Sequence, residues 1–185
     1  MPKVSQEHLD ARRRQILEGA QRAFARHGYA GATVARLEEE IGLSRGAIFN
    51  YFPSKLDLFV ALAEDVNRRY TALMHDQGMD AAIRGIADED PELLGMLIEI
   101  ESHLRHDEEF VRKLEAVAER ATPANRSVFE ARQRDGTYRD DIPAIELGRF
   151  ASMVLNGAAL RRASGDPFDV DATIRLLHDA LAPRK

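Results

Sequence analysis

The chain has 185 residues, 44% of them hydrophobic, and carries a formal net charge of −5 at pH 7 with no cysteine. The lack of cysteine excludes disulfides, thiol catalysis and cysteine-based zinc sites. No apolar run approaches the roughly 18–20 residues that a membrane-spanning helix needs, and the N-terminal stretch has no apolar signal-peptide core. We therefore expect a cytoplasmic protein with no membrane partner.

The charge is unevenly distributed along the chain. Residues 1–55 carry nine Lys or Arg and six Asp or Glu, which gives +3, whereas the remaining residues carry 17 and 25, which gives −8. A basic N-terminal part is typical of proteins that bind nucleic acid, because phosphates attract it. Phosphate repels the acidic part, which is therefore expected to stay off the duplex.

The first predicted helix runs from Leu9 to about His27 and ends at Gly28. Its apolar face consists of Ile16, Leu17, Ala20 and Phe24. Three arginines lie near its start, where the helix dipole prefers acids. Such a cluster favours contact with phosphate or the minor groove over its alternative, a solubilising arm. These residues are Arg12, Arg13 and Arg14.

Two short helices joined by a tight turn are predicted for residues 33–51. Thr33 is a helix N-cap residue, and an apolar stripe of Val34, Leu37 and Ile41 follows it. Gly42 stops this helix, since glycine adopts the left-handed conformation at no Cβ cost. Ser44 caps the second helix, which is expected to reach Tyr51.

The second short helix has the layout of a helix that lies in the DNA major groove. On its outward side Arg45 can pair with guanine and Asn50 with adenine. Gly46 and Ala47 are small, so the helix can approach base edges closely. For an isolated two-helix match the alternative is that these side chains are simply solvated.

The rest of the chain is predicted to be helical as well, so the expected fold is all-α with no strands. A long helix begins at Ser54, where Asp57 completes a capping box, and a short helix follows near residues 81–87. Pro91 opens a mostly apolar helix that ends near Arg105. The next helix, 107–134, should kink or break at Thr122-Pro123.

Two apolar helices, residues 144–162 and 169–182, close the chain. They predict a four-helix homodimer interface, with the alternative that they only cover the core of one monomer. A dimer would place two recognition helices about 34–36 Å apart, the spacing of a palindromic operator. The predicted organisation is a helix-turn-helix DNA-binding domain, residues 1–54, and a ligand-binding and dimerisation domain, residues 55–185.

No catalytic constellation is present, since the chain has no Gly-rich phosphate loop and no HExxH motif. We therefore expect no enzyme and no required cofactor, and we assign no metal site. His103 and His106 share a helix side with Glu99, an arrangement that is more often surface charge than a metal or anion site. Glu101 and Arg105 have the spacing of an ordinary helix salt bridge.

The run TVARLEEEIGLSRGAIFNYFPSK resembles the DNA-binding domain of TetR-family regulators. The matching residues are Thr33, Gly42, Ser44, Gly46, Ile48, Phe49, Phe52 and Lys55. Phe49 departs from the family, which usually has a tyrosine there whose hydroxyl meets a phosphate. The resemblance implies a homodimeric repressor with base contacts from Arg45, Gly46, Ala47 and Asn50. It implies phosphate contacts from Thr33, Ser44, Tyr51, Lys55 and the Arg12–Arg14 cluster.

The resemblance also implies a small-molecule pocket between the long fourth helix and residues 91–105, 108–134 and 144–162. The polar candidates to line it are Glu99, Glu101, His103, Arg105, Arg126 and Asn156. The segments IEIESHLRHD and YRDDIP, with the N-terminal run, resemble the actinobacterial aconitase-repressor branch, which responds to a citrate–Mg²⁺ complex. The alternatives are a TetR-like regulator of an apolar ligand, and a small helical enzyme or binding protein with a vestigial DNA-binding head.

Overall fold

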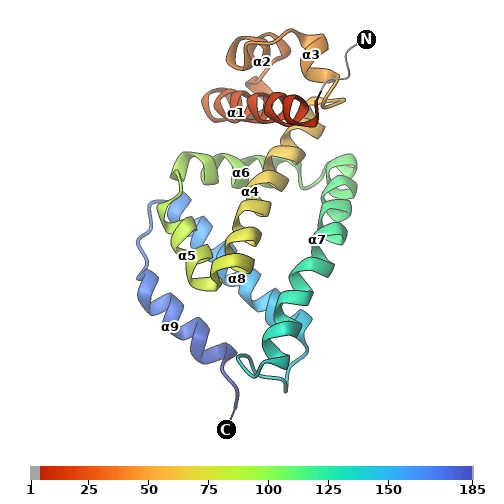
Figure 1. Ribbon diagram of the computed structural model, residues 1–185. Coiled ribbons are helices and arrows are strands. Elements are labelled where there is room, and N and C mark those ends of the chain that lie inside the picture. Colours follow the sequence, from red (N-terminus) through yellow and green to blue (C-terminus); the bar gives the residue numbers. More distant parts are fainter. Residues whose placement is uncertain (1–4, 185) are drawn as a thin grey trace.

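The computed structural model describes residues 5–184, apart from the side chains of His103, Ala118, residues 120–122 and residues 124–125. This part of the chain forms nine helices and no strand, which confirms the all-α expectation. Figure 1 shows α1–α3 as a head at one end of α4, with α5–α9 around the rest of that helix. The helices are α1 (Gln6–Gly31), α2 (Val34–Ile41), α3 (Arg45–Phe49), α4 (Lys55–Gln77), α5 (Met79–Asp88), α6 (Pro91–Leu104), α7 (Glu108–Arg134), α8 (Ala144–Ala163) and α9 (Val170–Leu181).

Side-chain caps fix the start of seven of these helices. In each case a serine, threonine or aspartate just before the helix accepts a hydrogen bond from a backbone N–H of the first turn. The caps predicted at Thr33, Ser44 and Ser54 are confirmed. The full set is Ser5, Thr33, Ser44, Ser54, Asp90, Asp107 and Asp169.

One continuous hydrophobic core joins the head to the helices below it. Phe24 of α1 packs edge-on against Phe59 of α4, with ring centroids 5.8 Å apart, and Phe59 contacts Phe110 of α7. The same cluster contains Ile48 of α3 and Ile100 of α6. No gap in packing marks the predicted division at residues 54 and 55, which stays a prediction.

Of the kink or break expected in α7 at Pro123, the break is wrong, because the helix runs through this residue from Glu108 to Arg134, and the kink stays a prediction. Proline removes one helical hydrogen bond and crowds the preceding turn. The helix is nevertheless anchored on both sides of Pro123, since Phe110 and Val117 before it and Phe129 after it are buried. Tertiary packing therefore overrides the local cost of the proline.

Other helix ends differ modestly from expectation. Helix α1 begins at Gln6 rather than Leu9, and it continues to Gly31 across a kink at Gly28, where φ is 64°. Helix α3 ends at Phe49, so the recognition helix is shorter than the expected Arg45–Tyr51. Asn50 caps it through a backbone N–H bonded to the Gly46 carbonyl.

The loop before α8 is fastened to the end of α9. Arg139 forms a bidentate ion pair with Asp141, in which two side-chain N–H donors each lie 2.7 Å from a carboxylate oxygen. The backbone N–H of Arg139 donates to the Leu181 carbonyl at 2.8 Å. Gln133 of α7 donates to the carbonyls of Arg139 and Ile142. The YRDDIP segment, residues 138–143, therefore has a structural role, because its hydrogen bonds connect α7, the start of α8 and the end of α9.

Helices α1 and α2 meet so closely at Gly19 that only glycine fits. A Cβ added there would lie 2.6 Å from the Ile41 Cα. We predict that Gly19→Ala lowers the free energy of unfolding by about 1–3 kcal/mol, because the backbones must separate. Gly95→Ala is the matched control, since its nearest neighbour would be the Ala163 Cβ at 3.9 Å. Urea unfolding measures both, and equal effects at the two sites would contradict this account.

Candidate nucleic-acid interface and ligand pocket

The turn between α2 and α3 is set by backbone conformation and by two caps. Gly42 takes the left-handed conformation (φ 74°, ψ 28°), as predicted. The Ser44 hydroxyl accepts from the Ala47 N–H at 3.4 Å, and the Glu38 carboxylate accepts from the Arg45 N–H at 2.6 Å. Glu38 thus binds the first turn of the recognition helix from the helix before it.

The predicted base-reading side chains lie on one exposed surface. Arg45, Gly46 and Asn50 are exposed and Ala47 is half-buried, while Ile48 is fully buried beneath them. A Cβ added to Gly46 would meet nothing within 4 Å, so this face of the helix is open. The short helix therefore presents small residues flanked by an arginine and an asparagine, a surface suited to the major groove.

The residues predicted to contact phosphate lie in varied settings. Thr33 and Ser44 are exposed, and each hydroxyl accepts one backbone N–H while its own hydrogen can still donate. Tyr51 is half-buried against the head core. Such hydroxyls at helix starts are suited to phosphate oxygens.

The three N-terminal arginines differ in how they are engaged. Arg12 donates to the Gln15 side chain, which itself donates to the Ile41 carbonyl of α2. The Arg13 guanidinium stacks on the ring of Phe52, 4.9 Å from its centroid. Arg14 is exposed and has no partner among the described residues. The cluster therefore combines structural contacts with an available positive charge.

Lys55 fastens the start of α4 to the end of α1. Its Nζ donates to the Tyr29 carbonyl at 2.7 Å and lies 4.5 Å from the centre of the Tyr29 ring. Burial lowers the pKa of Lys55 below its usual value. Two of its three N–H donors remain for a phosphate. The sequence motif predicted only the phosphate role.

A second fastening joins the first turn of α4 to α7. Asp57 accepts from the Ser54 hydroxyl at 2.7 Å and from the Lys113 ammonium at 2.5 Å. Burial acts to raise the pKa of Asp57, but the bonds from Lys113 and Ser54 outweigh it, so that the net shift is downward. No sequence pattern predicts this contact, because 56 residues separate Asp57 from Lys113.

A pocket of about 240 Å³ lies between α4, α5, α6, α7 and α8. It lies between the four segments that were expected to hold an effector, with α5 as an additional wall, and the binding of an effector there stays a prediction. The walls are mainly apolar, and a second hollow of about 50 Å³ shares Asn67, Tyr70, Ser152 and Leu155 with it. The polar side chains that line the larger pocket are Glu64, Asn67, Tyr70, Glu101, Ser152 and Asn156.

Two of the six predicted ligand residues, Glu101 and Asn156, line this pocket. Glu99 does not, because two residues along a helix correspond to about 200° of rotation and it is Glu101 that lies on the side of α6 bordering this pocket. Arg105 is exposed and donates to His106, and Arg126 pairs with Glu130 at 2.6 Å. These two arginines therefore do not line the pocket. The His103 side chain lies outside the described residues.

The Glu101 carboxyl has no hydrogen-bond or ion-pair partner among the described residues. The predicted alternative, a helix salt bridge to Arg105, is not formed, since Arg105 bonds to His106 instead. Solvent reaches Glu101, yet enough protein surrounds it that burial raises its pKa above the usual value. These two facts fit a carboxyl that faces a partly enclosed, water-accessible pocket.

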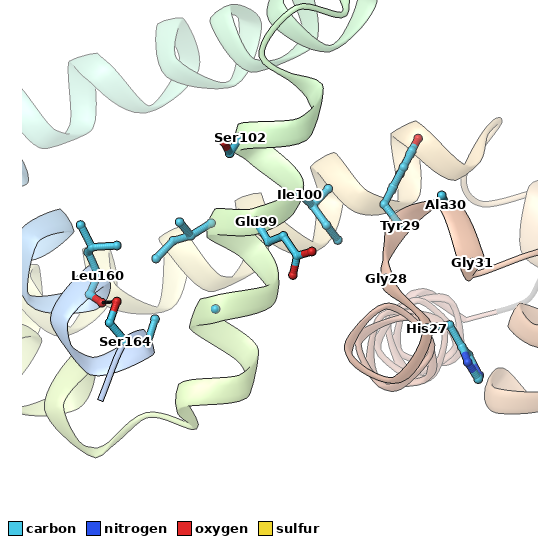
Figure 2. A pocket seen from close by; sticks show the side chains of 13 residues that line it. His27, Gly28, Tyr29, Ala30, Gly31, Glu99, Ile100, Ser102, Leu160 and Ser164 are labelled. Atoms are coloured by element: carbon cyan, nitrogen blue, oxygen red, sulfur yellow. Dashed lines mark hydrogen bonds between the residues drawn. The ribbon is translucent and has the colours of Figure 1, made fainter. Parts of the chain in front are cut away.

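A larger, open cleft of about 750 Å³ separates the end of α1 from α6 and the end of α8. Figure 2 shows Glu99 of α6 pointing into it, opposite Gly28 and Tyr29 of the head. Leu160 and Ser164 of α8 form the far wall. Glu99 therefore faces the space beneath the head and not the effector pocket.

No metal cluster and no membrane helix occur in the part of the chain that is described. Within residues 5–184, no three His, Cys, Asp or Glu side chains outside the undescribed ones gather closely enough to hold a metal ion. In the same part of the chain no helix is both long and apolar enough to cross a membrane.

Comparison with known proteins identifies the family. Residues 16–62 match the family described as bacterial regulatory proteins, tetR family. The chain is 39% identical over 184 residues to the HTH-type transcriptional repressor Rv1474c of Mycobacterium tuberculosis, covering 98% of both chains. The chain belongs to the TetR family. It is also 40% identical to the repressor AcnR of Corynebacterium diphtheriae, with 91% of this chain and 90% of that one covered.

Solved TetR-family structures have the same fold. A regulator from Rhodococcus sp. superposes with a TM-score of 0.75 at 17% identity, covering 92% of this chain and 96% of that one. The protein is thus a TetR-family transcriptional repressor and not an enzyme, since its relatives are transcriptional regulators. Members of this family bind operator DNA and act as dimers, so the geometry of α2 and α3 belongs to a DNA-binding head.

Proposed function

We propose that this TetR-family repressor binds a palindromic operator as a homodimer in the cytoplasm, and that a small molecule in the α4–α8 pocket modulates this binding. The observation that carries the proposal is the exposed surface of α3, which is fixed from below by Ile48 and from the side by Glu38. A rigid, small-residue helix flanked by donors can enter the major groove without reorganising.

Within this proposal the head contacts divide into two groups. Arg45 and Asn50 read base edges, while Gly46 and Ala47 allow the close approach. The phosphate contacts come from Arg12, Arg13, Arg14, Thr33, Ser44, Tyr51 and Lys55. Phosphate contacts position the protein on any sequence, and base contacts select one sequence.

Dimerisation through α8 and α9 is supported by the apolar side chains that these helices expose. Met153, Leu160 and Leu176 are exposed by 64%, 52% and 70%, and Phe150 by 37%. Phe150, Met153 and Leu160 recur at helical spacing along one face of α8. Exposed apolar patches of this kind mark interaction sites, and a second copy is the partner that a palindromic operator requires.

For the effector we propose the citrate–Mg²⁺ complex, with aconitase as the controlled function, following the resemblance to the aconitase-repressor branch. Relatives named AcnR, about 40% identical over most of the chain, support this choice. In the pocket, Glu101 can meet the metal ion, and the Asn156 amide can donate to a carboxylate. An apolar effector is the second candidate, which the mainly apolar walls favour.

We predict that Arg45→Ala and Lys55→Ala weaken DNA binding in different ways. Loss of Arg45 should cost about 1–3 kcal/mol on the operator and little on unrelated DNA, because a base contact is lost. Loss of Lys55 should weaken both and lower the salt slope by about one. Gel shifts on the protein's own upstream DNA over a salt series measure this.

Arg68→Ala is the control for that experiment, since it removes an exposed positive charge from α4, outside the predicted contacts. Equal losses on every sequence for Arg45→Ala and Lys55→Ala would reject the division into base and phosphate contacts. Melting temperatures of the free variants separate lost contacts from lost stability, which matters for Lys55 because it also binds the Tyr29 carbonyl.

Met153→Glu should shift the protein toward monomer, because a dimer would have to bury an unpaired carboxylate. Ala25→Glu places the same side chain at an exposed site of α1 and should leave the oligomeric state unchanged. Sedimentation velocity at micromolar protein reports both results. A Met153→Glu protein that sediments as the wild type would show that this face of α8 does not form the dimer.

Citrate together with Mg²⁺ should raise the melting temperature, since a ligand that binds only the folded state stabilises it. Four conditions are compared: citrate with Mg²⁺, citrate with a chelator, Mg²⁺ alone, and succinate with Mg²⁺ as the control. No shift with citrate, in the presence or absence of Mg²⁺, would count against the aconitase-repressor effector while leaving DNA binding to be judged separately.

A further inference from the structure

Glu38 bonds to both ends of the turn that joins α2 to the recognition helix. Its backbone carbonyl accepts from the Gly42 N–H at 2.9 Å, and its carboxylate accepts from the Arg45 N–H at 2.6 Å. Gly42 is the residue that ends α2, and Arg45 is the first residue of α3. One residue therefore holds the start and the end of the turn, residues 42–44.

The Glu38 side chain differs from the two acids that follow it. Glu38 is half-buried, and the Arg45 N–H is the one partner of its carboxylate among the described residues. Glu39 is exposed and has no partner among the described residues, whereas Glu40 pairs with two arginines of α1. Of these three acids, Glu38 is thus the one that bonds to the recognition helix.

We propose that Glu38 is a positioning residue for operator recognition, which holds the backbone of Arg45 so that the arginine side chain meets its base in a preset orientation. The inference deepens the proposed function and rests on it, because it assumes that Arg45 reads a base. Selectivity for the operator then depends on an acid that bonds to the protein and not to DNA, and whose charge by itself repels DNA.

The physical reason is that α3 is too short to hold its own first turn. It has five residues, and a helix of this length forms few hydrogen bonds for the backbone angles that it fixes. The first N–H groups of a helix have no partner within it. Here the Ser44 hydroxyl accepts from Ala47, and Glu38 accepts from Arg45 through a charge-assisted bond, which is stronger than a neutral one.

Loss of the Glu38 bond should reduce selectivity more than affinity. A loosened Arg45 has to be ordered when it pairs with a base, and this ordering costs free energy on the operator. Unrelated DNA is held through phosphate contacts, which do not require one orientation of Arg45. Loss of the charge weakens repulsion from every DNA sequence equally. The loss of the bond therefore changes the ratio of the two affinities, and the loss of the charge does not.

Glu38→Ala tests this expectation on two duplexes of equal length, the protein's own upstream DNA and an unrelated sequence. The operator preference is the Kd for the unrelated duplex divided by the Kd for the operator. We expect Glu38→Ala to lower this preference about tenfold, while the Kd for unrelated DNA stays equal or falls. Fluorescence anisotropy at one fixed salt concentration measures both constants.

Glu39→Ala is the matched control, because it removes the same charge one residue along α2 without removing a bond. It should change both Kd values by the same factor and leave the preference as in the wild type. An unchanged preference in Glu38→Ala, or an equal fall in Glu39→Ala, would overturn the proposal.

A double-mutant cycle shows whether Glu38 acts through the Arg45 side chain. Arg45→Ala keeps the backbone N–H that Glu38 binds, but it removes the group that reads the base. Glu38→Ala should therefore cause no further loss of preference when it is added to Arg45→Ala. A general weakening of the head would lower the preference in either background, so that an additive loss would overturn the proposal.

Glu38→Gln keeps the size of the side chain and an oxygen that can accept from the Arg45 N–H, although without charge. It should lower the preference less than Glu38→Ala does, and it decides the question if melting curves show that Glu38→Ala is unfolded. In that case a preference equal to that of the wild type would overturn the proposal.

The wild type separates this inference from the function on which it rests. A wild-type protein without preference for any promoter sequence would overturn the proposed function and the role of Glu38 with it. A wild-type preference that survives Glu38→Ala would overturn the role of Glu38 alone.

Discussion

The first turn of α4 is the constraint on which the arrangement of the molecule depends. Within four residues it bonds to α1 through Lys55 and the Tyr29 carbonyl, and to α7 through Asp57 and Lys113. Beneath these polar contacts the Phe24 and Phe59 rings meet edge-on and the Phe59 and Phe110 rings pack at a tilt, which connects the same three helices. This short, well-bonded segment and the packing of α1 on α6 therefore set the orientation of the DNA-binding head relative to the body.

Features that depend on neighbours in sequence were predictable. Thr33, Ser44 and Ser54 cap helices because a hydroxyl there reaches a backbone N–H three residues on, and Gly42 terminates α2 because only a residue without Cβ takes its conformation easily. Contacts between residues far apart in the sequence were not predictable. The bond from Glu38 to the Arg45 N–H, and that from Lys113 to Asp57, depend on how helices pack, which periodicity does not encode.

The predicted ligand residues also show that helix packing is not encoded in local sequence patterns. A pocket lies between the helices that were expected to hold an effector, yet of the five proposed side chains that the structure describes two line it, Glu101 and Asn156. Glu99 of α6 and Arg105, which follows the last residue of α6, face elsewhere. A mostly apolar helix gives no clear polar side from which to infer which acid borders the pocket. At Pro123 the local sequence predicts a break, but the helix continues because Phe110, Val117 and Phe129 are packed in the core on both sides of the proline.

Helix α7 offers a physical route from the pocket to the head within the proposed function. Leu114 lines the pocket, and its neighbour Lys113 bonds to Asp57 at the start of α4. A ligand that fits only one position of α7 would therefore also select one geometry of this ion pair. It would thereby select one orientation of residues 50–54, which join α3 to α4. Coupling of this kind requires differential affinity for two arrangements, not transmission over distance.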